Sequence, residues 1–318
     1  MSAGKKYLET LVRDGFITTD DENKVNTWFK ERPFSLYWEL RIILYLGVVL
    51  FSTGIGMLIY EHIDTIGHSV LIGMIAIATL ACYGYCFKNG KPFDSGRVEQ
   101  PGHLFDYVLL LGCMLFLALE GYLQFQYQLF GNSYEIAALI PAILFFFMAY
   151  RFDHLGVLSM AITALASFAG IILSFNFIAQ ELYTGYQLIY TGLAFAITIL
   201  TAGFLSNKYD FKKHFTFTYY NFGFHTFALA ALGGCFSLLP SLVYLVILLS
   251  GAALMIRYAI RTQSFYFLLI SVLYSYIGIT WAIFRFNLAS ISMLYYFVVS
   301  CVGIIYFFMN YKKILKIK

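Results

Sequence analysis

The sequence predicts an all-α, polytopic integral membrane protein of about ten transmembrane helices, with a short cytoplasmic helical hairpin at its N-terminus. Of the 318 residues, 60% are hydrophobic and 12% are charged, and the mean hydropathy is +0.75. In a typical soluble domain about 25% of the residues are charged. From residue 41 onward, apolar runs of membrane-crossing length alternate with short polar breaks. We therefore expect a lipid bilayer to surround most of the chain.

The first forty residues are rich in charge and predict a two-helix hairpin. Residues 8–12 indicate a short amphipathic helix that ends at Gly15. Thr19 and Glu22 then fit a capping box, in which each side chain satisfies a free amide at the start of a second helix. This second helix ends at Pro33. Because two short helices bury little surface, we expect the hairpin to dock on the membrane domain, on the bilayer or on a second copy of the chain.

Ten apolar runs make up most of the remaining chain. They cover residues 42–60, 69–87, 104–123, 135–150, 156–178, 186–205, 215–232, 241–259, 264–284 and 291–310. Each is close to the length that a helix needs to cross about 30 Å of hydrocarbon. Gly233, Gly234 and Pro240 predict a turn between the seventh and eighth spans. The predicted domains are a cytoplasmic segment at 1–40, a ten-span domain at 41–311 and a basic cytoplasmic tail at 312–318.

Lysine and arginine residues predict the orientation of the spans. When the loops are assigned to alternate sides, all but one of the 21 Lys and Arg residues fall on the side of the two termini. The exception is Arg285. Because these residues concentrate in cytoplasmic loops, both termini are predicted to be cytoplasmic. One span too many or too few would move every later loop to the other side, so this asymmetry also supports the count of ten.

Polar residues inside the predicted spans are the first candidates for a functional site, since they are costly in hydrocarbon. His225 lies deepest in its span, with Thr218 and Asn221 on the same helical face. One interpretation is a proton or substrate relay at His225. The other is a neutral histidine hydrogen-bonded to Asn221 and a neighbouring helix. Asp106 lies just inside the cytoplasmic end of the third span, where solvent or a nearby basic residue suffices.

A second group of candidates lies on the predicted outward side. Glu120 lies near the outer end of the third span, and we expect it to pair with Arg285, because a lone guanidinium favours a carboxylate partner. The alternative is that Arg285 extends to lipid phosphate. Candidates for an outward pocket that takes a polar or cationic ligand are Gln124, Gln126, Gln128, Glu135, Asn176 and Gln187. Ordinary loop solvation accounts for the same residues.

The sequence contains no established catalytic motif. It lacks a G-x-S-x-G elbow, an H-E-x-x-H pair, a phosphate-binding loop and a dinucleotide fingerprint. This argues against an ordinary hydrolase, ATPase or reductase. Cys82 and Cys86 share a helical face but have no histidine or carboxylate at ligand spacing, so we interpret them as packing residues. We expect no metal, no cofactor and no nucleic-acid partner.

The order of features in the first half of the chain resembles that of a known family. The features are Leu8-x-x-Leu11-x-x-x-Gly15-x-Ile17-Thr18, an acidic helix start, Trp38-Glu39-Leu40-Arg41, Leu46-Gly47 to Gly54-x-Gly56, and Ile63-Asp64. In these features residues 5–150 resemble the bacterial predicted membrane proteins called domain of unknown function 2157 (DUF2157). The resemblance implies a bacterial cytoplasmic (inner) membrane. It implies no established activity and no catalytic residue.

Three functions remain open on the sequence alone. The first is transport or ligand handling through a membrane-embedded polar site, because ten spans divide into two five-span halves of opposite orientation, as in many secondary transporters. The second is a scaffold or regulatory role in which residues 5–32 bind a protein partner or a second copy. The third is an intramembrane enzyme acting on lipid or envelope precursors, although the missing motifs favour a protein that is not an enzyme.

Cysteine labelling tests the predicted topology. We expect cysteines placed near Arg97, Lys212 and Lys316 to react only from the cytoplasmic side, and cysteines near Asp64 and Glu181 only from outside, because the basic residues mark the cytoplasmic loops. The measurement compares a membrane-impermeant maleimide on intact cells and on inverted vesicles. Reaction near Lys212 in intact cells would contradict the ten-span arrangement.

Overall fold

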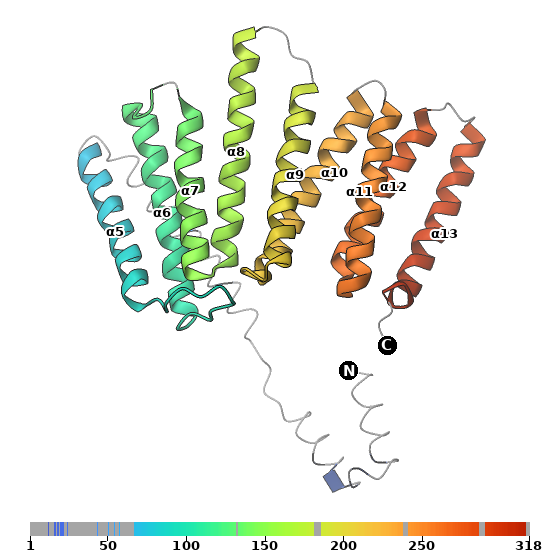
Figure 1. Ribbon diagram of the computed structural model, residues 1–318, viewed down its shortest axis with the longest axis horizontal. Coiled ribbons are helices and arrows are strands. Elements are labelled where there is room, and N and C mark those ends of the chain that lie inside the picture. The colour runs from blue at the N-terminus through green and yellow to red at the C-terminus, as the bar shows by residue number, and fades with distance from the viewer. Residues whose placement is uncertain are drawn as a thin grey trace. The chain divides into compact units, whose positions relative to one another are not determined.

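The computed structural model describes residues 67–131, 133–180, 186–237, 241–285 and 290–315, with a few single residues before them. The chain divides into two compact units, Met1–His68 and Ser69–Lys318, and each is considered by itself. The described part of the second unit consists of nine long helices without strands (Figure 1). They are α5 His68–Asn89, α6 His103–Tyr127, α7 Tyr134–Phe152, α8 Leu155–Gln180, α9 Tyr186–Lys208, α10 Thr216–Ser237, α11 Ser241–Thr262, α12 Phe265–Arg285 and α13 Ser290–Ile314.

These helices confirm that nine of the ten predicted apolar runs are helical. The first predicted run, 42–60, lies almost entirely outside the described residues, so the count of ten and the division into domains stay predictions. The turn predicted between the seventh and eighth spans does not begin at Gly233 and Gly234, because α10 continues through both to Ser237. The reason is a close contact: a Cβ on Gly234 would lie 2.3 Å from the ring of Tyr244, so the glycine lets α11 pack against the α10 backbone. Pro240 lies outside the described residues.

Within the described residues, seven helices are long and apolar enough to cross a membrane. They are α5, α6, α7, α9, α11, α12 and the Tyr295–Ile314 part of α13. The described apolar part of α8, Leu155–Gly170, is shorter. The helix α10 has 22 residues but carries Asn221 and His225, which lower its hydropathy. The fold is therefore that of a helical membrane protein with several spans.

Neighbouring helices run in alternate directions, and this separates the charges of the second unit into two ends. In Figure 1 the C-terminal ends of α5, α7, α9, α11 and α13 lie together with the N-terminal ends of α6, α8, α10 and α12. This basic end, as we call it, carries Lys88, Lys91, Arg97, Arg151, Lys208, Lys212, Lys213, Arg257, Arg261, Lys312 and Lys313. Arg285, at the C-terminal end of α12, is the exception among the described lysines and arginines from residue 67 onward.

Helix α10 takes part in both of the larger apolar cores. One core gathers buried side chains from α5 through α10, including Phe105, Phe152 and Tyr219. The other lies between α10, α11, α12 and the end of α13 and includes Phe224 and Phe267. A single helix thus joins the first half of the second unit to its last three helices.

In the first unit, Asp20 and Asp21 are helical, and the described Thr18 before them is not. The Asp21 N–H donates a hydrogen bond to the Thr18 hydroxyl (3.3 Å), and the Thr18 N–H donates to the Asp21 carboxylate (3.2 Å). This is the reciprocal pattern of a capping box. It lies one position before the predicted pair, Thr19 and Glu22, and both of these lie outside the described residues, as does most of the hairpin. The hydrogen bond from the Thr18 hydroxyl to the same carboxylate (2.6 Å) lowers the pKa of Asp21.

A glycine in the contact between α9 and α10 gives a packing test. A Cβ on Gly223 would lie 2.8 Å from Cγ of Leu200 and 3.2 Å from its backbone nitrogen, so the two helices would have to separate. We expect Gly223→Ala to lower the melting temperature of the purified protein. The matched control is Gly84→Ala on α5, where a Cβ would meet nothing within 4 Å in the described structure. That variant should gain helix propensity of up to about 1 kcal/mol. Equal melting shifts in the two variants would refute the close contact.

Candidate functional site

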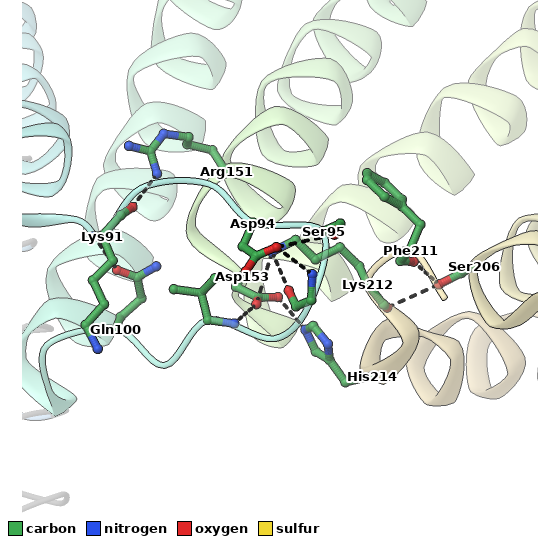
Figure 2. A network of polar contacts seen from close by, with 12 residues as sticks. Lys91, Asp94, Ser95, Gln100, Arg151, Asp153, Ser206, Phe211, Lys212 and His214 are labelled. Atoms are coloured by element: carbon green, nitrogen blue, oxygen red, sulfur yellow. Dashed lines mark hydrogen bonds and ion pairs between the residues drawn. The ribbon is translucent and has the colours of Figure 1, made fainter. Parts of the chain in front are cut away.

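A buried charge cluster occupies the basic end, at the corner where α7 ends and α8 begins (Figure 2). Asp153 caps α7 in a left-handed backbone conformation with φ of 60°, and its side chain is 1% exposed. Its carboxylate accepts hydrogen bonds from the Val98 N–H and from Nε2 of His214. Nζ of Lys212 lies 3.1 Å from the same carboxylate. One acid therefore holds the loop before α6, the α7–α8 corner and the segment before α10.

Lys212 is as completely enclosed as its partner. Its backbone N–H donates to the carbonyl of Ser95 (2.8 Å), and its Nζ donates to the carbonyl of Gly96 (3.1 Å). The Nζ also lies 5.0 Å from the centroid of the Phe93 ring, which provides a cation–π contact. A cysteine at position 212 would be buried and could not report on topology by maleimide labelling. The exposed neighbour Lys213 is the better position for that label.

In this cluster one acid, Asp153, lies beside two basic side chains, Lys212 and His214. Burial lowers the pKa of His214, the Asp153 carboxylate opposes this shift, and Lys212 adds to it. Burial sets the direction, because it disfavours the protonated ring, and Lys212, which already pairs with Asp153, adds a smaller effect of the same sign. We infer a neutral His214. We interpret the cluster as a structural lock, because its polar groups satisfy one another.

Asp106 belongs to a separate contact near the same end. Its carboxylate lies 4.0 Å from Nε2 of His154, and the side chain is 41% exposed. Nδ1 of His154 accepts a hydrogen bond from the Val157 N–H (3.1 Å) and so caps the start of α8. Burial lowers the pKa of His154, and Asp106 opposes that shift. Asp106 and His154 thus fix the α6–α8 approach and lie apart from the other predicted site residues.

His225 joins α10 to α12 through the hydroxyl groups of Tyr266 and Tyr274, which the sequence did not predict as partners. The Tyr266 hydroxyl donates to Oδ1 of Asn221, so its oxygen accepts from Nε2–H of His225 (2.8 Å). Nδ1 of His225 then accepts from the Tyr274 hydroxyl (2.8 Å). This arrangement uses both ring nitrogens of a neutral histidine. Thr218 is buried on the same helix. Of the two interpretations of His225, the geometry favours the hydrogen-bonded one, with Tyr266 between the ring and Asn221.

Glu120 lies in a polar groove between α6 and α7. The groove, here called the Glu120 groove, has a volume of about 530 Å³. It is lined by Leu117, Glu120, Gly121, Gln124, Phe125, Gln128, Tyr134 and Ala137. The Glu120 side chain belongs to a residue that is 6% exposed, and neither carboxylate oxygen has a hydrogen-bond partner among the described residues. The expected pair with Arg285 is therefore wrong: the Arg285 guanidinium instead lies 5.6 Å from the centroid of the Trp281 ring.

Gln124, one helical turn after Glu120, shapes the groove. The Gln124 side-chain amide donates to the carbonyl of Gly131 (2.9 Å) and accepts from the Phe130 N–H (2.9 Å). Gln124 therefore holds the α6–α7 loop against the end of α6. The left-handed cap of α6 is Gln128, with φ of 48°. These contacts give the groove a wall whose shape does not depend on a ligand.

The structure brings together only some of the predicted outward residues. Gln124 and Gln128 line the Glu120 groove, whereas Gln126 is exposed and outside its lining. Glu135 is half-buried in the first turn of α7 and does not line the groove. Gln187 is exposed at the start of α9, and Asn176 lies on α8, where the structure describes the backbone alone. Tyr134, a groove residue, was not predicted; its place in the first turn of α7, next to the predicted Glu135, was the available signal.

The observed architecture defines the class of the protein: a helical membrane protein with several spans, closed at one end by buried charge contacts and carrying a polar groove near the other. Comparison of families then gives a more particular result. Residues 9–158 match the model of the family described as "Predicted membrane protein (DUF2157)", which confirms the resemblance noted in the sequence. Comparison with curated proteins and with solved structures gave no match. The matched segment contains Glu120 and Asp153 and ends before Lys212.

The lock makes a prediction about pH. Because burial lowers the pKa of His214, its protonation opposes folding, and the wild-type protein should lose stability as pH falls below the ordinary histidine value of about 6.5. In Lys212→Met the ring becomes the remaining cation beside Asp153, so the pKa of His214 should rise above the unfolded value. The variant is less stable overall, since breaking a buried ion pair costs about 3–5 kcal/mol. Relative to wild type, it should recover stability as pH falls.

The measurement is the melting temperature of detergent-solubilised protein at several values between about pH 5 and about pH 8. Lys213→Met is the matched control, because Lys213 is exposed and pairs with the exposed Asp210. Its melting curve should follow that of the wild type. If Lys212→Met and Lys213→Met show the same pH dependence, His214 does not share the Asp153 carboxylate with Lys212.

Proposed function

We propose that the protein binds a small organic cation in the Glu120 groove and handles or transports it within the membrane. The observation that supports this proposal is the Glu120 carboxylate, which is 6% exposed and without a hydrogen-bond partner in the described structure. An ionised group in such surroundings is costly unless a counter-charge or a proton neutralises it. A cationic ligand supplies that counter-charge.

The depth of Glu120 strengthens this argument. Helix α6 continues to Tyr127, so Glu120 lies about 10 Å, or two turns, from the helix end. This is deeper than the sequence suggested, because the predicted span ended at residue 123. A carboxylate at the membrane surface would be solvated, whereas one at this depth depends on what the groove holds.

The lining of the groove fits an organic ammonium ion. Two aromatic side chains, Phe125 and Tyr134, line the groove, and the exposed ring of Phe125 offers a face for a cation–π contact. Gln128 adds an amide. The volume of about 530 Å³ lies in the range of small-molecule sites. Carboxylate, aromatic faces and amide oxygens together recognise a cation better than an anion.

The orientation of the bilayer around the chain is part of the same proposal. The basic residues collect at one end of the helices, and this supports a cytoplasmic position for that end in a bacterial inner membrane. The Glu120 groove, near the C-terminal end of α6, would then open toward the outside. Ligand handling would begin at the outer face.

Binding by the wild-type protein and by Glu120→Gln tests the proposal. The probes are ethylammonium, putrescine and tetramethylammonium, titrated calorimetrically into the full chain in bilayer discs. We expect at least one of them to bind the wild type and to bind Glu120→Gln at least about tenfold more weakly, because the variant loses the charge that pairs with the ligand.

Glu135→Gln is the control, since it removes a nearby acid that does not line the groove. Its affinity for the probe should equal that of the wild type. The proposal fails if none of the three cations binds the wild type, or if Glu120→Gln and Glu135→Gln weaken binding equally.

A further inference from the structure

A second groove lies among α9, α10 and α11, at a distance along the chain from Glu120. Its volume is about 600 Å³, and its walls are almost entirely apolar. Phe204 of α9, Tyr220 of α10 and Tyr258 of α11 line it near the basic end. Ile197 and Ile247 line it further from that end. Phe204 and Leu254 are also exposed on the outside of the bundle, so the groove opens laterally.

The groove has the length of a lipid chain. Its lining on α11 runs from Ile247 to Tyr258, which corresponds to about 16 Å of helix. Half of the hydrocarbon core of a bilayer is about 15 Å thick. The near end lies about one turn inside the helix ends, because α10 begins at Thr216 and α11 ends at Thr262. The groove therefore has a length close to the thickness of one leaflet and begins about one turn from the helix ends.

Basic side chains continue the groove-lining faces beyond its near end. Arg261 follows Tyr258 by three residues, and Arg257 follows Leu254 by three, so both share a helical face with lining residues. Lys208 follows Phe204 by four residues on the facing helix. All three side chains are exposed. Neither arginine makes an ion pair or a hydrogen bond with any residue in the described part of the chain.

We propose that this site, the α9–α11 groove with Arg257, Arg261 and Lys208 at its mouth, binds an anionic phospholipid. One acyl chain lies in the groove, and the phosphate of the headgroup lies against the two arginines. Guanidinium groups suit this role because they bind phosphate oxygens with two parallel hydrogen bonds. Tyr220 and Tyr258 stand at the depth of the glycerol and ester groups, where amphipathic rings are favourable.

Charge and shape together favour a lipid over a second copy of the chain. A second helix in the groove would bring its own apolar surface but would leave the arginines without an anion. The end of a helix that reaches this depth from a second copy is the basic end again, and like charges would then face each other. An anionic lipid satisfies the apolar walls and the cationic mouth at once.

The test measures lipid binding by the full chain in detergent, with phosphatidylglycerol and phosphatidylcholine of equal chain length as probes. Native mass spectrometry gives the number of retained lipids, and thermal unfolding gives the stabilisation. We expect phosphatidylglycerol to be retained and to raise the melting temperature more than phosphatidylcholine does. In the double variant Arg257→Gln/Arg261→Gln, the affinity for phosphatidylglycerol should fall by about tenfold or more.

Three further variants separate the site from general charge and from misfolding. Arg257→Lys/Arg261→Lys keeps the charge and should keep most of the binding. Lys312→Gln/Lys313→Gln removes two charges from the same end, outside the groove, and should bind phosphatidylglycerol like the wild type. Leu254→Trp narrows the groove at an exposed lining position and should weaken the binding of both lipids.

Several outcomes would overturn the proposal. One is full retention of phosphatidylglycerol by Arg257→Gln/Arg261→Gln, and another is an equal loss in Lys312→Gln/Lys313→Gln. Stabilisation by soluble glycerol phosphate as strong as that by phosphatidylglycerol would mean that the arginines take a phosphate without its lipid. Dimers that persist unchanged when phosphatidylglycerol is added and dissociate in Leu254→Trp would mean that a second copy fills the groove.

Discussion

Asp153 and Lys212 lie 3.1 Å apart with both side chains 1% exposed, and three separate breaks in the helical bundle take their shape from this contact. Two of the contributing residues adopt left-handed backbone conformations, Asp153 with φ of 60° and Lys212 with φ of 50°. Such conformations cost energy for residues other than glycine. They persist here because the carboxylate, the ammonium group and the carbonyls of Ser95 and Gly96 satisfy one another. The corner between α7 and α8 can then be tight, which allows these two helices to pack along their length.

The same constraint, that a polar group away from water needs a partner, separates the remaining candidates by role. His225 has both ring nitrogens occupied by tyrosine hydroxyls from α12, so its chemistry is complete within the protein. Glu120 is buried to a greater extent and has neither oxygen occupied in the described structure. A polar group whose hydrogen bonds are all made within the protein holds helices together. A buried group in a groove without hydrogen-bond partners is a candidate for binding a ligand. The proposed ligand site therefore lies on α6 and not on α10.

The sequence predicted the helices well because each depends on composition over about twenty residues, and a few misplaced side chains change little. It began a turn at Gly233 and Gly234, where α10 in fact continues, because a glycine that weakens an isolated helix can also admit a neighbouring ring, here Tyr244 at Gly234. It identified Glu120 and Gln124 from their positions near a helix end. It paired Glu120 with the wrong partner because charge tallies along a chain contain no information about which helices are neighbours. It did not predict Tyr266 and Tyr274 as partners of His225, because nothing in the sequence distinguishes them from the other tyrosines among the 26.

The contacts among Val98, Asp153 and Lys212 at the basic end form in a fixed order, because these residues emerge from the ribosome at different times. Val98 and Asp153 belong to the segment that matches the family model, whereas Lys212 follows Asp153 by about 60 residues, or roughly 3–12 s of synthesis. During that interval α8 and α9 enter the membrane while the carboxylate has an amide partner and no cation. The first helices would thus be held in a provisional state until Lys212 has been synthesised. They become fixed when the segment before α10 arrives, so the order of translation sets the order of assembly.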